Sequence, residues 1–425
     1  MSRSPFWHPF ADMRAVSEGG ELVVDRAEGY YVFDEDGRRY LDATASLWYC
    51  NVGHGRHEIV EATRAQMARL EAYSTFGDLT NRPVRDLAER VAAIAPVDDS
   101  AVFLTSGGSD SIDTAVKLAR RYFQVTGQPQ RRYVIGRTRA YHGMHIAGTS
   151  IAGIEANIDG YGELLRDVRV VEWDSHDDLV TTIDEIGADN VAAFVCEPII
   201  GAGGVLAPPP GYLEKARSTC REAGVLFVAD EVVTGFGRTG HWFASGRFDL
   251  EPDLVVCAKG ITSGYLPMGA VIVAPAIAEP WFNGDAGMWR HGYTYSGHAT
   301  VAAAALANLA ILEDEGLLEN AARLERTLAE SLGPLAEHDL VSEVRAGVGA
   351  LAAIQLDTAA VAADPALPTR AVAACRDHGI MTRILMGHAL HVSPPLILDD
   401  AGVSEMAAGM RAALDQVLAS PHPPN

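Results

Sequence analysis

The 425-residue sequence is short of basic residues, of paired cysteines and of long apolar runs. Its 34 lysines and arginines stand against 56 acidic residues, and the resulting net charge of −22 argues against nucleic acid or an anionic membrane as a partner. The five cysteines are scattered and form no CxxC pair, so we expect reduced, mostly buried thiols and a cytoplasmic location. The first residues show no apolar signal-peptide stretch, and no run approaches the roughly 20 apolar residues of a membrane span.

The length of the chain indicates more than one domain. We place a boundary near residue 315, where an alanine-rich helical pattern ends in a Glu-Gly pair. The predicted division is an N-terminal segment, 1–60, that packs with the small domain, a large domain, 61–315, and a small α+β C-terminal domain, 316–425. The proline-rich tail of the last domain is predicted to be disordered.

Two apolar runs end next to charged side chains. The run 225–229 precedes Asp230, and the run 254–258 precedes Lys259. Such runs are typical of buried strands in a parallel sheet, and open α/β sheets bind ligands at the carboxyl ends of these strands. A lysine in apolar surroundings can attack a carbonyl, and a carboxylate is the usual partner of the ring nitrogen of pyridoxal phosphate. The two strand ends therefore indicate a pyridoxal phosphate site, which other segments must complete.

A glycine loop follows another predicted strand, 101–105. The loop Ser-Gly-Gly-Ser-Asp-Ser, 106–111, leads into a helical pattern, and a strand, glycine loop and helix in succession present backbone N–H groups to a phosphate. Three interpretations have similar weight for this loop alone. It is a capped helix start, another kind of phosphate site, or the pyrophosphate loop of the adenylating ATP pyrophosphatases, which it resembles.

Two more candidate residues lie at the ends of predicted strands. Tyr141 follows the strand 133–136, so its ring could cover a flat cofactor, although an ordinary loop tyrosine is an equal alternative. Glu197 follows the strand 191–196 and precedes a run of glycines that allows a ligand to approach the backbone closely.

A metal site is not predicted. His54 and His57 have a spacing found in metal sites, but Gly55 between them weakens the helix that would align them, and no third ligand is close.

Six motifs, in this order and spacing, resemble those of the class III aminotransferases: SGGSD, YHG, CEPIIGAGG, ADEVVTGFGRTG, CAKGITSGYLPMGA and YTYSGH. Those enzymes use pyridoxal phosphate and have the aspartate-aminotransferase-like fold (fold type I), an α/β fold in which a large domain with a mostly parallel central sheet binds the cofactor. Two further stretches, SLWYCNVGHGR and STFGDLTNRPV, look most like those of amine and ω-amino acid:pyruvate transaminases. The resemblance covers roughly residues 20–415. It argues against the adenylating enzyme, which would not require both Asp230 and Lys259.

The resemblance implies the catalytic roles. Lys259 would hold the cofactor covalently and move the substrate's proton, and Asp230 would pair with the pyridine nitrogen. Val232 and Tyr141 would pack on the two faces of the ring.

The resemblance also implies the binding residues. Thr294 would reach the phosphate of the neighbouring subunit's cofactor, which makes the protein a homodimer or homotetramer. The other cofactor-binding residues would be Gly107, Gly108, Ser109, His142 and Glu197, and the substrate pocket would be lined by Trp48, Phe76, Tyr141, Ala202 and Arg383.

The implied reaction moves an amino group from a primary amine or ω-amino acid to a keto acid, pyruvate, giving an aldehyde or ketone and alanine. The enzyme would be (S)-selective ω-transaminase-like. Two alternatives of the same fold are a pyridoxal phosphate-dependent aminomutase or decarboxylase and a non-enzymatic, cofactor-binding regulatory protein. The intact Lys259, Asp230 and phosphate loop count against the regulatory protein.

Two departures from the family pattern concern the substrate side. Ile200 stands where many relatives carry Gln, so a polar contact is lost. The segment that begins at Arg383 holds one residue more than in close members, which leaves open whether Arg383 reaches a substrate carboxylate.

Overall fold

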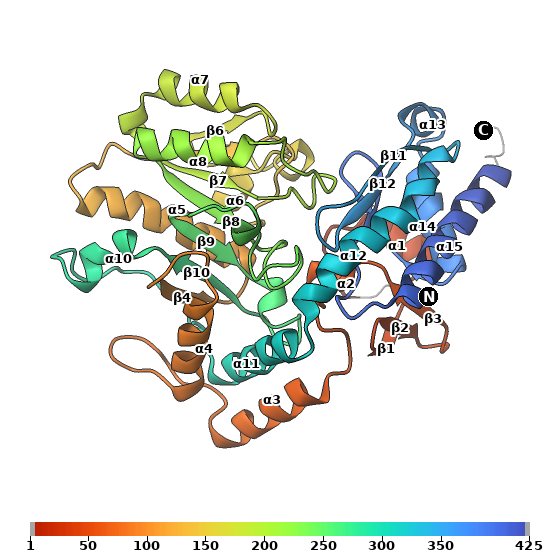
Figure 1. Ribbon diagram of the computed structural model, residues 1–425, viewed down its shortest axis with the longest axis horizontal. Helices are drawn as coiled ribbons and strands as arrows, with labels where there is room; N and C mark the ends of the chain where they lie inside the picture. The colour runs from red at the N-terminus through yellow and green to blue at the C-terminus, as the bar shows by residue number, and fades with distance from the viewer. Residues whose placement is uncertain (1–4, 421–425) are drawn as a thin grey trace.

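The computed structural model describes residues 5–420, so the predicted disorder of 421–425 lies outside this range. Its central feature is a seven-stranded sheet (Figure 1). The sheet is mostly parallel, as predicted, because only β10 runs antiparallel to its neighbours. Its strands lie in the order β4 (Ala101–Thr105), β10 (Gly269–Val273), β9 (Leu254–Cys257), β8 (Leu226–Asp230), β7 (Val191–Cys196), β5 (Tyr133–Arg137) and β6 (Val168–Val171).

This sheet is buried on both faces, which explains the continuous apolar runs in the sequence. Every residue of β7, β8 and β9 is buried. Successive side chains point to opposite faces, so Val228 and its neighbour Phe227 belong to separate apolar clusters. One cluster includes side chains of α5 (Gly108–Val125), α6 (Ile146–Ile151) and α10 (Pro275–Phe282), and the other includes side chains of α7 (His176–Ile186) and α8 (Tyr212–Ala223).

A second group of elements lies to the right of the large sheet in Figure 1. It contains an antiparallel sheet in the order β11 (Val341–Arg345), β12 (Ala352–Leu356), β15 (Ala389–Val392) and β14 (Ile384–Leu385). Its helices are α12 (Leu317–Leu332), α13 (Thr358–Ala363), α14 (Leu367–Asp377) and α15 (Asp400–Ala419).

Three helices lie below the large sheet in Figure 1, and α11 packs against the other two. They are α3 (His57–Arg69), α4 (Arg82–Ala93) and α11 (Ala299–Asp314). The proposed boundary near residue 315 falls in the turn between α11 and α12. The division into domains itself stays a prediction.

The N-terminal strands pair with the C-terminal part of the chain. β1 (Val24–Glu28), β2 (Tyr31–Asp34) and β3 (Arg39–Asp42) are antiparallel, and β3 pairs in parallel with β13 (Ile380–Met381). The Asp36-Gly37 pair lies in the turn between β2 and β3, which form a hairpin. His54, which we did not predict to bind a metal, forms a hydrogen bond between its Nε2 and Oδ2 of Asp42, the last residue of β3, at 3.0 Å.

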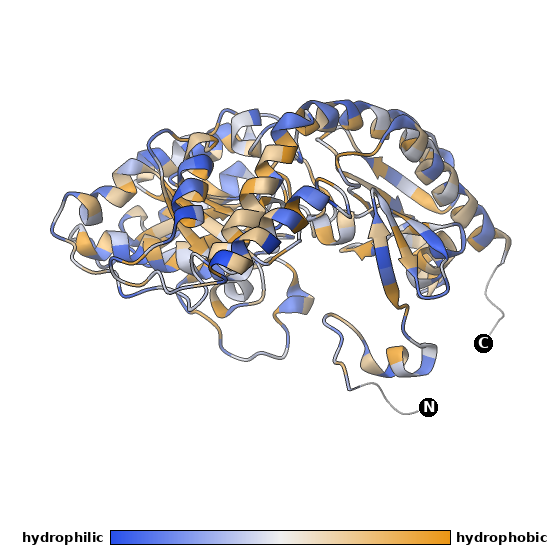
Figure 2. Ribbon diagram, turned by 90° about the horizontal axis from the view of Figure 1, so that it is seen from below, coloured by the Kyte–Doolittle hydropathy of each residue, from blue (hydrophilic) through white to orange (hydrophobic). Residues whose placement is uncertain are grey.

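The arm before β1 contains a short helix, α1 (Met13–Gly19). Asp12 caps this helix by accepting hydrogen bonds from the N–H groups of Arg14 and Ala15, and such a cap compensates for a weak apolar pattern. Figure 2 shows α1 standing away from the rest of the chain, in keeping with its lack of buried residues.

The five cysteines are buried, as predicted. No helix within residues 5–420 is long and apolar enough to cross a membrane.

Candidate active site

The strands of the large sheet bring the predicted side chains together at one edge. Asp230 is the last residue of β8, Lys259 lies two residues beyond β9, and Glu197 follows β7 directly. Because β8 pairs in parallel with both β7 and β9, these three strand ends are neighbours. The loops after β4 and β5 add the glycine loop and Tyr141.

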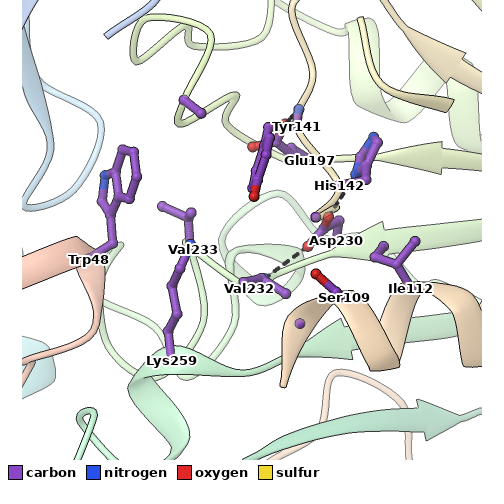
Figure 3. Close-up of a pocket in the computed structure, with 13 residues that line it drawn as sticks. Trp48, Ser109, Ile112, Tyr141, His142, Glu197, Asp230, Val232, Val233 and Lys259 are labelled. Carbon is purple, nitrogen blue, oxygen red and sulfur yellow. Dashed lines mark hydrogen bonds and ion pairs between the residues drawn. The ribbon is translucent and has the colours of Figure 1, made fainter. Parts of the chain in front are cut away.

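These strand ends form the floor of a pocket of about 610 Å³. Figure 3 shows Lys259 extending into it, with Trp48 on one side and Asp230 and Ser109 on the other. The pocket is lined by Trp48, Gly108, Ser109, Ile112, Tyr141, His142, Gly143, Glu197, Ala202, Asp230, Val232, Val233 and Lys259.

Lys259 is the reactive group that the pocket encloses. Its backbone has a φ of 46°, a left-handed conformation that costs a residue with a side chain about 1 kcal/mol. Its Nζ makes no hydrogen bond or ion pair with any residue of 5–420 and lies 5.0 Å from the centroid of the Trp48 ring. Desolvation lowers the pKa of Lys259 to about 8, and the positive charge of Arg383 acts in the same direction. The negative charge of Asp230 offsets part of this fall, and a minority of the amine is neutral near physiological pH, far more than for a free lysine.

Asp230 is held in place from two sides. Its Oδ2 lies 2.7 Å from Nδ1 of His142, and its Oδ1 accepts a hydrogen bond from the N–H of Val232 at 3.1 Å (Figure 3). Asp230 and His142 are both buried. The carboxylate therefore presents a fixed orientation to the pocket, as a partner for a ring nitrogen must.

Glu197 anchors two of the loops that border the pocket. Its Oε1 accepts from the N–H of Tyr141 at 2.9 Å, and its Oε2 accepts from the N–H of Gly201 at 3.0 Å. Burial raises the pKa of Glu197, and the two backbone N–H groups offset part of that rise. Glu197 therefore positions both the loop that carries Tyr141 and the glycine-rich loop that begins at Gly201 and includes Ala202.

The glycine loop opens the long helix α5. Gly107 is the N-cap residue with an extended backbone, and the helix begins at Gly108, so its first N–H groups have no partner within the helix. A Cβ on Gly108 would lie 3.2 Å from a methyl group of Val232. Glycine therefore lets the start of α5 lie close to Val232 without crowding its side chain. Ser109 is fixed by the N–H of Met144, which donates to Oγ at 3.1 Å.

The wall opposite Asp230 is formed by Trp48 of the short helix α2 (Ala45–Trp48), and Arg383 of the second group of elements packs on its ring without lining the pocket itself. Trp48 is buried, and the guanidinium carbon of Arg383 lies 4.2 Å from the centroid of its ring. Arg383 pairs through its C=O with the N–H of His391 at 3.0 Å, ahead of the turn between β14 and β15. This pairing fixes the backbone of Arg383 close to the strand that carries His391.

Two predicted residues lie elsewhere in the chain. Phe76 and Thr294 are exposed and line a separate pocket of about 640 Å³ together with Tyr73 and Tyr295. No side chain of that pocket also lines the pocket around Lys259.

The structure also adds residues that the sequence did not single out. Ile112, Gly143 and Val233 line the pocket next to predicted positions. The exposed ring of Phe10 meets Tyr141 edge to face, with centroids 6.5 Å apart. The aromatic residues of the N-terminal arm were the only sequence signal for that contact, and they did not indicate its location.

The comparisons with known proteins agree with one another. The family model "Aminotransferase class-III" matches residues 14–414. The putrescine–pyruvate aminotransferase of Pseudomonas aeruginosa is 39% identical, covering 99% of this chain and 96% of that protein. A PLP-bound amine transaminase from an uncultivated Pseudomonas species has a TM-score of 0.92 at 37% identity, covering 98% of this chain and 99% of the other. An (S)-enantioselective omega-transaminase from Thermomicrobium roseum has a TM-score of 0.92 at 38% identity, covering 97% and 96%.

The fold, including the sheet edge described above, matches that of the PLP-bound transaminase over almost the whole chain. This match defines a pyridoxal phosphate-dependent enzyme of fold type I. The chain belongs to the class III aminotransferase family. The predicted fold class, enzyme class and cofactor are thereby confirmed, and the adenylating interpretation of the loop 106–111 is not supported.

The residues of this chain fit pyridoxal phosphate. The unpaired amine of Lys259 suits its aldehyde, and the fixed carboxylate of Asp230 suits its ring nitrogen. The start of α5 offers unpaired N–H groups and a positive helix end to its phosphate.

The lowered pKa of Lys259 leads to a prediction about cofactor loading. Only the neutral amine attacks the aldehyde, and a pKa lowered to about 8 makes the neutral form predominate above that pH. We expect the rate of pyridoxal phosphate uptake by cofactor-free protein to rise with pH, with a midpoint near 8. The measurement is stopped-flow absorbance across pH 6–11, with Nα-acetyl-lysine as the solution control. A midpoint at the control's value, two or more units higher, would show that the pocket does not tune this amine.

Proposed function

We propose that this enzyme moves the amino group of a primary amine or ω-amino acid to pyruvate, releasing an aldehyde or ketone and alanine. The observation that carries the proposal is the placement of Lys259 and Arg383 around the same Trp48 ring, at 5.0 and 4.2 Å. One group serves as a base and the other as a binding group for a carboxylate, so one pocket suits both halves of the reaction.

The bound cofactor would supply an electron sink for the C–H bond electrons of the substrate. Lys259 Nζ, in its neutral form, takes the proton from the amino-bearing carbon of the substrate. The resulting ammonium then gives that proton back as a general acid, so Lys259 ends the half-reaction neutral again. Asp230, oriented by His142, keeps a positive charge on the ring nitrogen that draws those electrons. Val232 and Tyr141 line the pocket between these groups and are proposed to enclose the ring.

Arg383 is proposed to bind the carboxylate of the keto acid. Burial lowers its pKa to about 10, which still leaves the guanidinium charged at neutral pH. Its planar fork can bind both carboxylate oxygens. When the partner is an apolar amine, the rings of Trp48 and Tyr141 offer apolar surface instead.

The lining of the pocket favours some donors over others. Among its described residues the carboxylates are Glu197 and Asp230, and both are already engaged, by backbone N–H groups and by His142. A diamine would find no unengaged carboxylate of this chain for its second ammonium, whereas an ω-amino acid would find Arg383. We therefore propose ω-amino acids and aryl-alkyl amines of (S) configuration as better donors than putrescine, for which one relative is named.

Phe76 and Thr294 are proposed to act in the site of a second copy. Both are exposed and share one pocket with an apolar lining, 57% of Phe76 being accessible in the single chain. An arrangement in which two copies exchange these residues would place Thr294 at the partner's phosphate and Phe76 at the partner's substrate pocket. We propose a homodimer or homotetramer on this basis. We also propose a cytoplasmic location, in which the five free, buried thiols stay reduced.

A panel of amino donors with pyruvate tests the function. We expect alanine to form in equal amount with the carbonyl product from β-alanine and (S)-1-phenylethylamine, and more slowly from putrescine. Lys259→Ala should lower turnover by at least about 10⁴-fold, because it removes both the cofactor anchor and the proton carrier. Loss of CO₂ or migration of the amino group without alanine would instead identify a decarboxylase or an aminomutase.

Arg383→Ala tests the carboxylate site. We expect the KM for pyruvate to rise about 10- to 100-fold, the effect of losing a charge-assisted bidentate contact. The KM for (S)-1-phenylethylamine, which has no carboxylate, should change less than about threefold. Steady-state kinetics with both substrates varied provide the measurement. An equal rise in both KM values would assign the carboxylate to a different group.

A further inference from the structure

His391 contacts both Trp48 and Arg383 but does not line the pocket itself. It belongs to β15 and is completely buried. The centroid of its ring lies 4.2 Å from that of Trp48, and its Nδ1 lies 3.4 Å from Nε of Arg383. Neither the pocket lining nor the roles described above account for a buried imidazole at this place.

The hydrogen bonds around this ring determine where its proton lies. Arg383 can only donate, so Nδ1 of His391 must accept from it, and the proton of the neutral ring then sits on Nε2. Nε2 lies 2.6 Å from Oγ of Ser393, which therefore accepts. The Ser393 hydroxyl in turn donates to the C=O of Thr44 at 3.2 Å. Each N–H and O–H group in this series of hydrogen bonds, from Arg383 to Thr44, has one acceptor. The imidazole of His391 is therefore held in a single orientation.

The same contacts reach the backbone of Trp48. The C=O of Thr44 that accepts from Ser393 also accepts from the N–H of Trp48, at 3.0 Å. Trp48 needs such support because its own backbone has a φ of 63°, a left-handed conformation. His391 therefore contacts Arg383 through one ring nitrogen and is linked to Trp48 through the other.

The charge state of the ring suits this task. Burial holds the pKa of His391 well below its ordinary value, and the positive charges of Arg383, Arg238 and Lys259 act in the same direction. The ring therefore stays neutral at physiological pH and can accept from Arg383 instead of repelling it. Arg383 forms no ion pair with any carboxylate of residues 5–420, so its two Nη groups remain available to a ligand.

We propose that His391 is a positioning residue for carboxylate recognition: by holding Nε of Arg383 and backing the ring of Trp48, it aims the two Nη groups of Arg383 at the substrate carboxylate. This inference rests on the proposed function of Arg383 as the carboxylate site. It assigns to His391 a larger effect on carboxylate-bearing substrates than on amines without a carboxylate, because such an amine uses Trp48 but not Arg383.

Two variants test the proposal in the holoenzyme. His391→Leu keeps a similar volume but removes the acceptor, and we expect the KM for pyruvate to rise about tenfold. The KM for (S)-1-phenylethylamine should change less than about twofold. His391→Asn restores an acceptor close to the position of Nδ1, and it should bring the KM for pyruvate back to within about threefold of the wild type. The Asn variant also keeps the test available if His391→Leu fails to fold.

His338→Leu is the matched control. His338 is likewise buried, and its Nδ1 accepts from the N–H of Leu340, far from the pocket lining. A loss of stability caused by replacing a buried histidine should appear in both Leu variants as a lower Tm. A rise in the KM for pyruvate that is larger than the rise in the KM for (S)-1-phenylethylamine should appear only in His391→Leu.

A double-mutant cycle separates an effect through Arg383 from an independent one. In an Arg383→Ala background, His391→Leu should raise the KM for pyruvate by no more than about twofold further. A full tenfold rise in that background, or equal rises in both KM values in the single variant, would overturn the proposal for His391 while leaving the transaminase function intact. A wild-type enzyme that forms no alanine from pyruvate would overturn the proposed function, and this inference with it.

Discussion

The enclosure of the Lys259 amine without a hydrogen-bonding or ionic partner is the constraint on which the rest of the site depends. Protein crowds this amine closely enough to lower its pKa to about 8, and the charge of Arg383 adds to that effect. The charge of Asp230 raises this pKa in part, but no direct ion pair forms, because that carboxylate is engaged by His142 and by the N–H of Val232. Parallel pairing of β8 with β9 brings the two groups near each other, and the hydrogen bonds of Asp230 to His142 and Val232 keep its carboxylate engaged away from the amine.

The two sides of the pocket come from different parts of the chain and serve different purposes. The ends of the large sheet's strands carry Lys259, Asp230 and Glu197, the groups proposed to hold the cofactor and move the proton. On the opposite side Trp48 of α2 lines the pocket, and Arg383 and His391 of the second group of elements pack on its ring. Reaction type can therefore be preserved by the sheet while the other wall changes to select substrates. This separation explains why one fold serves many transaminases.

The parts of this picture that could be predicted from sequence are those with a local signal. Apolar runs ending in Asp230 and Lys259 marked two buried strands, and the glycine loop at 106–111 marked the start of the helix α5. The two-residue strand β13 lacks such a signal, because it exists only through its pairing with β3. Phe76 could be named from the resemblance, but its place on a separate, exposed surface could not. His391 escaped notice because a single buried polar residue leaves no periodic pattern.

The most direct measurement of the central claim, that Lys259 carries the proton, is chemical rescue. Cofactor-loaded Lys259→Ala protein is mixed with a donor deuterated at its amino-bearing carbon, and loss of deuterium is followed by NMR with and without methylamine. The account predicts no loss without methylamine and a rate that rises with its concentration, since the small amine can occupy the space of the missing side chain. Loss of deuterium at the wild-type rate without added amine would contradict the account, because another group would then be the base.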